Sequence, residues 1–95
     1  MHTRVSHYKV KPGKLDEAIA ARDEMLPTIE KLPGLVRYLN LWNDDGTGAV
    51  VAVYESPAAA EAAAATAKDM WSSLADILEP EVTIQEFANG LEVTP

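Results

Sequence analysis

Histidine is the side chain whose ordinary pKa lies between about 5 and 8, which makes it the natural candidate for a general base. The sequence has two histidines, His2 and His7, and only His7 lies inside a segment with the composition of a strand. We therefore predict that His7 is a catalytic base that takes a proton from a phenolic molecule. The alternative is a hydrogen-bonded histidine that lines a barrel and has no part in catalysis.

Aromatic and amide side chains could hold such a molecule. Aromatic rings stack on planar ligands and tyrosine hydroxyls orient them, although plain core packing is the competing interpretation. Asparagine is depleted in strands and needs partners when it is buried. Asn40 therefore either faces a ligand or makes a hydrogen bond at a sheet edge or dimer contact. The predicted ligand-binding residues are Tyr8, Asn40, Trp42, Tyr54 and Trp71.

Charge and composition exclude several other classes of function. The chain carries 8 basic and 15 acidic residues, a net charge of −7, which argues against nucleic-acid and anionic-membrane partners. It has no cysteine, so disulfides, thiolate metal sites and cysteine nucleophiles are excluded. No histidine or carboxylate spacing matches a metal motif, and we expect no metal and no cofactor. The first residues lack the apolar run of a signal peptide, and we expect a cytoplasmic protein.

Strand and helix patterns alternate along the chain. Apolar side chains at helical spacing predict a first helix over residues 15–32, in which Pro27 should either cause a kink or shift the hydrogen bonding. Ser56 has the character of an N-cap for a second helix. This helix either runs unbroken to about residue 78 or is interrupted near residues 66–69. Runs of strand-forming residues between turn signals predict four strands, at residues 3–10, 35–42, 49–54 and 81–87.

This order, βαββαβ, predicts a ferredoxin-like α+β sandwich, and 95 residues are enough for one domain, residues 1–95. Both helices should cover the same face of the sheet, which leaves the other face without helices. A face as apolar as this one implies a partner, and we predict a homodimer through it. Which sheet face lines a ligand cavity stays open. The helix-free face is expected to carry Val5, His7, Leu35, Leu39, Leu41, Val51 and Val53, or the alternate set.

Three short segments resemble the antibiotic-biosynthesis monooxygenase family. They are YKVKPGK at residues 8–14 before an acidic helix, LPG at residues 32–34, and YESP at residues 54–57. The resemblance implies a dimeric α+β barrel. The family includes cofactor-free oxygenases of quinols and polycyclic phenols, haem-degrading members, and many members of unknown activity, so the resemblance leaves these three possibilities.

The family's known site residues can be placed on this chain by their spacing from these segments. The Asn, Trp, Tyr and Arg that grip the substrate in its oxygenases fall near Val50, Tyr54, Ala60 and Leu74, and only Tyr54 keeps an aromatic ring. The Asn, Trp and His of the haem-degrading branch fall on Ser6, Ala63 and Ser73, so we expect no haem.

The prediction from sequence is therefore a cofactor-independent monooxygenase acting on a small aromatic or quinol-type molecule. On this interpretation, His7→Ala should abolish most oxygen consumption. The alternative is a non-catalytic, dimeric small-molecule-binding or stress-related protein of the same fold. The two differ in whether polar groups converge on one pocket or are satisfied by the protein itself.

Overall fold

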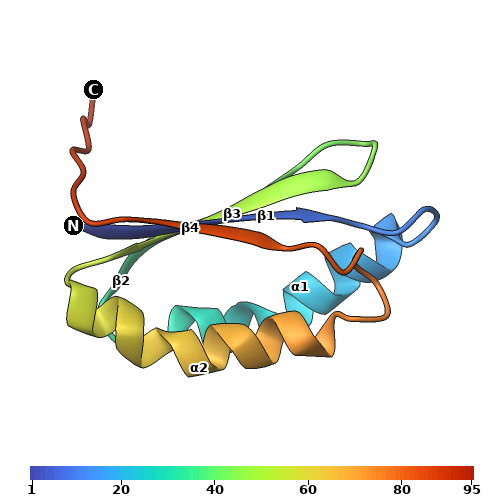
Figure 1. Cartoon of the computed structure of the whole chain (residues 1–95), viewed down its shortest axis with the longest axis horizontal. Helices are drawn as coiled ribbons and strands as arrows, with labels where there is room; N and C mark the ends of the chain where they lie inside the picture. Colours follow the sequence, from blue (N-terminus) through green and yellow to red (C-terminus); the bar gives the residue numbers. More distant parts are fainter.

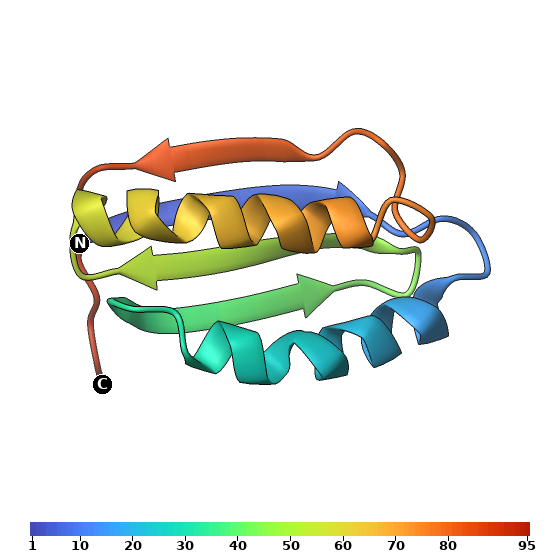
Figure 2. The same ribbon diagram turned by 90° about the horizontal axis from the view of Figure 1, so that it is seen from below.

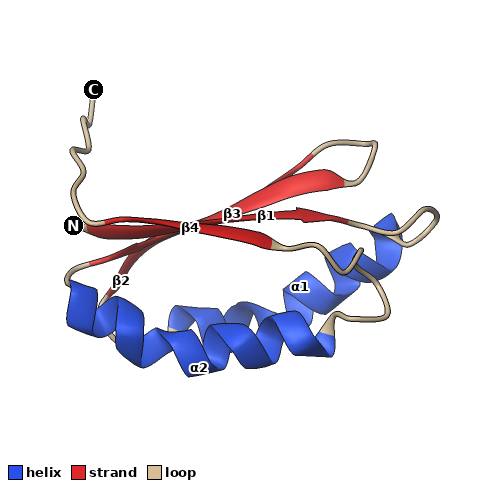
Figure 3. Ribbon diagram, viewed as in Figure 1, coloured by secondary structure: helices blue, strands red, loops and turns tan.

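The computed structural model describes residues 1–95 as a sheet with two helices on one of its faces (Figures 1 and 3). The strands pair in the order β2-β3-β1-β4, and every neighbouring pair is antiparallel. This arrangement confirms the ferredoxin-like prediction. The elements are β1 (His2–Lys9), α1 (Leu15–Glu30), β2 (Leu35–Trp42), β3 (Thr47–Tyr54), α2 (Pro57–Ser73) and β4 (Thr83–Phe87).

The helix α2 begins where its sequence predicts. The Ser56 side chain accepts a hydrogen bond from the Ala59 backbone N–H at 3.1 Å, as an N-cap residue does. The helix runs without interruption to Ser73, so the alternative with a break near residues 66–69 is wrong. It also ends before residue 78, because the chain here turns to pair with the end of β1. The Ile77 carbonyl accepts from the Lys11 N–H at 2.9 Å, and this pairing takes the backbone out of the helix.

The sheet contains one irregularity that the sequence did not predict. The register between β2 and β3 shifts between Leu35 and Arg37, as in a β-bulge. Leu35 consequently pairs with Tyr54 and packs on the helix side, and Arg37 pairs with Val53. The expectation that Leu35 lies on the helix-free face was therefore wrong. A bulge reverses the facing of every residue before it, which a simple alternation cannot anticipate.

Alanines allow α2 to approach the sheet closely. Ala60 and Ala63 are almost fully buried against Ala52 and Tyr54, and these four residues form one buried core cluster. Seen from the helix side, α2 lies over the centre of the sheet and α1 lies along β2, while β4 has no helix above it (Figure 2). The space between α2 and β4 is therefore not filled by another element. Neither helix is long and apolar enough to cross a membrane.

The helix-free face of the sheet exposes large apolar side chains that no helix covers. Its exposed side chains include Leu39, Leu41 and Phe87, which are 42%, 50% and 43% exposed. The C-terminal segment, residues 88–95, rises from the end of β4 on this side of the sheet (Figure 1). One ion pair connects the segment to the sheet, between Arg37 Nη2 and Glu92 Oε1 at 2.6 Å.

Candidate functional site

A cavity of about 80 Å³ lies between the helices and the sheet. Fourteen of its eighteen lining residues are hydrophobic, so the cavity suits the apolar body of an organic ligand. The four polar residues are Arg4 and Ser6 of β1, Arg22 of α1 and Asn40 of β2.

Tyr8 and Asn40 form a hydrogen-bonded pair at the wall of this cavity. The Tyr8 hydroxyl donates to Asn40 Oδ1 at 2.8 Å and lies 3.1 Å from the Leu41 carbonyl oxygen. Because the Asn40 carbonyl oxygen accepts from Tyr8, its Nδ2 group is left to donate, and it has no partner within the chain. The Tyr8 ring also packs against Trp71, with 5.8 Å between the ring centroids.

Gly48 is what leaves room for the Tyr8 ring. Tyr8 and Gly48 face each other across β1 and β3. A Cβ atom on Gly48 would lie 2.5 Å from the Tyr8 hydroxyl oxygen and 2.6 Å from the Leu41 carbonyl oxygen, closer than real Cβ contacts. The absence of a side chain at Gly48 therefore lets Tyr8 lie across β3 and reach Asn40.

The tyrosines of the cavity are proton donors and not bases at neutral pH. Burial, with smaller contributions from Tyr8 and Tyr54, raises the pKa of Tyr38 to about 12. Burial also raises the pKa of Tyr8, against the opposing effect of Arg22, and the pKa of Tyr54, against the opposing effect of Arg4. The Tyr38 hydroxyl has no hydrogen-bond partner within the chain, so it is free to donate to an oxygen atom of a ligand.

Arg4 is buried next to the core and uses only part of its hydrogen-bonding capacity. Its Nε donates to Glu86 Oε1 at 3.0 Å, and its Nη2 donates to the Ala60 carbonyl oxygen at 2.9 Å. The guanidinium carbon lies 5.6 Å from the centroid of the Tyr54 ring, within cation–π range. The remaining nitrogen, Nη1, is buried without a partner.

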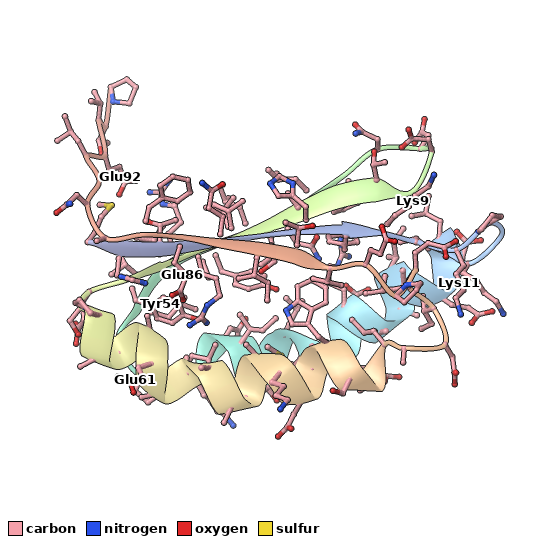
Figure 4. All side chains as sticks on the ribbon, in the orientation of Figure 1. Lys9, Lys11, Tyr54, Glu61, Glu86 and Glu92 are labelled. Carbon is pink, nitrogen blue, oxygen red and sulfur yellow. The ribbon has the colours of Figure 1, made fainter.

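The structure brings four of the five predicted ligand-binding residues to the same cavity, namely Tyr8, Asn40, Tyr54 and Trp71. Tyr54 lies between the sheet and α2 (Figure 4). Trp42 is not a lining residue. It is 42% exposed and lies beneath the Arg22 guanidinium, 5.0 Å from it. The binding of a ligand by these residues stays a prediction.

His7 does not belong to this cavity. It pairs with Ala49 and Thr83 across the sheet and is exposed. Successive side chains of a strand point to opposite faces, so Tyr8 faces the helices and His7 faces away from them. The two predicted site residues therefore cannot share one cavity in a single chain, and the cavity lacks the base expected from the sequence.

The prediction missed Arg4, Arg22 and Tyr38. For Arg4 a signal was available, since Arg4, Ser6 and Tyr8 alternate along β1 and so share one face. A charged residue in phase with a predicted ligand residue is a candidate for the same site. Arg22 belongs to a helix whose other charged residues face solvent, and its place at the cavity depends on packing. No three His, Asp or Glu side chains lie close enough together to hold a metal ion.

A second, larger hollow of about 400 Å³ lies between α2 and β4, where the sheet has no helix above it. Its walls include Ala64 and Lys68 of α2 and Ile84 and Glu86 of β4. Three residues line both this cleft and the cavity, namely Arg4, Ala67 and Trp71. The cleft and the cavity therefore adjoin at these side chains.

No protein-family model matches this sequence, and no curated protein matches it either. Solved structures do match over nearly the whole chain. A putative antibiotic biosynthesis monooxygenase from Deinococcus radiodurans has a TM-score of 0.82 at 10% identity, covering 100% of this chain and 98% of that one. SnoaB, a cofactor-independent oxygenase from Streptomyces nogalater, has a TM-score of 0.78 at 18% identity, covering 99% and 97%.

A protein of unknown function from Nitrosomonas europaea matches equally well, with a TM-score of 0.82 at 16% identity, covering 99% of this chain and 93% of that one. Sequence identities this low establish a shared fold and do not establish a shared activity. The resemblance found in the sequence is thus confirmed in the fold: the chain has the ferredoxin-like α+β fold of solved antibiotic biosynthesis monooxygenases.

Proposed function

We propose that the protein binds a small phenol in the cavity between helices and sheet and oxygenates it without a cofactor. The observation that carries this proposal is an apolar cavity with hydrogen-bond donors that have no partner, Tyr38 Oη and Asn40 Nδ2. Such donors fit a ring that carries oxygen substituents, because the ring oxygens can accept the hydrogen bonds that these donors leave unmade within the chain. The fold shared with SnoaB, a cofactor-independent oxygenase, supports the reaction class by analogy.

The size of the cavity favours a single ring. Ligands of drug size occupy pockets of roughly 300–1,000 Å³, and this cavity holds about 80 Å³. A polycyclic phenol would require the helices to move away from the sheet. The proposed substrate is therefore a one-ring phenol whose carbon para to the hydroxyl bears hydrogen.

The reaction balances without any further reactant. The phenol accepts one atom of dioxygen at the para carbon and becomes a para-quinone. The other oxygen atom leaves as water with two hydrogen atoms, one from the hydroxyl and one from the para carbon. The ring loses four electrons and dioxygen gains four. Within the cavity, Tyr38 and Asn40 would donate hydrogen bonds to the phenolate oxygen and hold the ring in place.

A variant of Asn40 tests this function. We expect the wild type to consume one dioxygen per phenol, measured with an oxygen electrode, and to form the quinone, measured by absorbance. Asn40→Leu removes a donor to the developing oxyanion and should lower the rate by about 10²–10³-fold. Asn89→Leu, a change in the exposed C-terminal segment, is the matched control and should leave the rate unchanged. Equal rates for wild type and Asn40→Leu would rule out this role for Asn40.

The second candidate is a non-catalytic binding protein with the same fold. The observation that favours it is the lining of the cavity, which includes no His, Asp or Glu to accept the phenol proton. This candidate predicts that one-ring phenols bind to the protein and that none of them causes oxygen consumption. Calorimetry together with the oxygen electrode separates the two.

We further propose that two copies associate through the helix-free sheet face. In such a dimer His7 would lie between the two sheets, away from both cavities. We expect His7→Ala to keep the affinity for a one-ring phenol within about twofold, as measured by calorimetry, because His7 contacts neither the cavity nor the cleft. If His7→Ala kept its affinity for the phenol but no longer consumed oxygen, His7 would be the catalytic base after all.

A further inference from the structure

The cavity is positively charged inside an acidic protein. The chain carries a net charge of −7, yet the only charged residues that line the cavity are Arg4 and Arg22. No carboxylate lines it. Each arginine is paired with a carboxylate outside the lining, Arg4 with Glu86 at 3.0 Å and Arg22 with Asp23 at 2.7 Å. Beside an apolar lining, what remains of their positive charge is screened less than at an open surface. A ligand that carries a negative charge is therefore the one that this cavity complements.

Arg4 is the better placed of the two arginines. It is only 8% exposed, and its Nη1 atom is buried with no hydrogen-bond partner. The bonds from its Nε to Glu86 and from its Nη2 to the Ala60 carbonyl oxygen fix the plane of the guanidinium. A fixed, buried and unpaired donor costs free energy in the empty protein, and an acceptor oxygen from a ligand would recover it.

The pairing with Glu86 does not use up the charge of Arg4. The Glu86 side chain is 49% exposed, so its carboxylate stays partly hydrated and neutralises the arginine only in part. Its Oε1 accepts from the Arg4 Nε, the one guanidinium nitrogen that it bonds, and lies 3.7 Å from His2 Nε2. The guanidinium can therefore bind a second anionic oxygen through Nη1 without displacing Glu86.

Arg4 lies at the boundary between the cavity and the cleft. It lines both the interior cavity and the open cleft between α2 and β4, together with Ala67 and Trp71. The small side chain of Ala67 and the ring of Trp71 lie at the same boundary.

We propose that Arg4 is a binding residue for a negatively charged oxygen, phenolate or carboxylate, on a single aromatic ring, and that the cavity selects ligands in the ionised form. The proposal rests on the cavity of the proposed function and names its substrate class more closely. Where the ligand is a phenolate, this also accounts for the missing base, because the phenol has left its proton in solution and needs no His, Asp or Glu in the cavity.

Benzoate and benzamide test the proposal, because they match in shape and differ in charge at neutral pH. We expect calorimetry to show benzoate binding to the wild type about tenfold or more tightly than benzamide, as a charge-assisted hydrogen bond implies. Arg4→Gln should abolish this preference, because it should weaken the binding of benzoate and leave the binding of benzamide unchanged. Lys14→Gln makes the same change of charge at an exposed site and should keep the preference.

A second variant acts in the opposite direction and does not remove a buried group. Glu86→Gln takes away the carboxylate that partly neutralises Arg4, so it should increase the affinity for benzoate severalfold and leave that for benzamide unchanged. A decrease would contradict the proposal even if Arg4→Gln failed to fold.

The outcomes also separate this proposal from the proposed oxygenase activity. Equal binding of benzoate and benzamide to the wild type would overturn the role of Arg4 and leave a cavity for neutral rings. A benzoate preference that depends on Arg4, without oxygen consumption on any phenol, would support the role of Arg4 and overturn the oxygenase. Binding of neither molecule would overturn the proposal together with the one-ring ligand class on which it rests.

Discussion

Val51→Glu is expected to convert the protein from a dimer into a monomer. Val51 lies in the middle of the helix-free face, where it pairs with Val5 of β1 and Leu39 of β2. In the proposed dimer its side chain would be enclosed between two sheets. A carboxylate there would lose its hydration without gaining a partner, a cost of several kcal/mol for each copy.

Light scattering at micromolar concentration measures this change directly. The wild type should have about twice the chain mass of 10.3 kDa, and Val51→Glu should have the mass of one chain. Leu26→Glu is the control, because Leu26 is an exposed apolar residue of α1 and not of the sheet. It should stay dimeric. A monomeric wild type, or a dimeric Val51→Glu, would contradict association through this face.

The physical reason for a dimer is the apolar surface that the chain leaves open. Leu39, Leu41 and Phe87 are each more than 40% exposed on one face. Monomers rarely leave contiguous apolar patches above about 600 Å² in water. The C-terminal segment carries further exposed apolar residues, Leu91 and Val93, and Glu92 of this segment lies above the same face (Figure 4).

Local patterns were sufficient to predict the fold. Period-two alternation in the strands and the Ser56 N-cap lead to the observed order of elements, because each depends on residues close in sequence. Leu35 was placed on the wrong face because a β-bulge is a property of two paired strands and not of one segment. The end of α2 was also misplaced, since it depends on hydrogen bonds between residues 77 and 11.

The candidate site was predicted less well than the fold. Much of the difference comes from the way successive side chains of a strand point to opposite faces of the sheet. His7 and Tyr8 are adjacent in a strand, so their side chains point to opposite faces, and the predicted site that included both could not form within one chain. The alanines of α2 show a second limit. Ala63 closes against the core while Ala67 lines the cavity and the cleft. An alanine of α2 therefore either packs closely on the sheet or borders a hollow, and the angle at which α2 crosses the sheet decides which.

Replacing Tyr54 is expected to cause the largest loss of stability in this chain. Tyr54 is 2% exposed, and its ring packs against Ala52, Ala60 and Ala63. Truncating a buried aromatic ring typically costs about 3–5 kcal/mol, because the surrounding atoms collapse only partly into the space. Domains of this size have a total free energy of unfolding of about 5–15 kcal/mol. Tyr54→Ala should therefore lose a large part of the stability.

Tyr54→Phe separates the ring from its hydroxyl. It keeps the packing and should cost no more than about 1.5 kcal/mol, the net contribution of one hydrogen bond. Urea unfolding followed by circular dichroism, at one fixed protein concentration because association adds to stability, measures both variants. Similar losses for Tyr54→Ala and Tyr54→Phe would show that the ring contributes little to the core.

The two Tyr54 variants also report on the site, because this ring is both core and cavity wall. It lies beneath the Arg4 guanidinium, so its loss removes a cation–π contact that helps to hold Arg4 in place. We expect Tyr54→Phe to keep the preference for benzoate over benzamide, since the ring face remains. Loss of that preference in Tyr54→Phe would mean that the tyrosine hydroxyl, and not Arg4 alone, binds the charged oxygen.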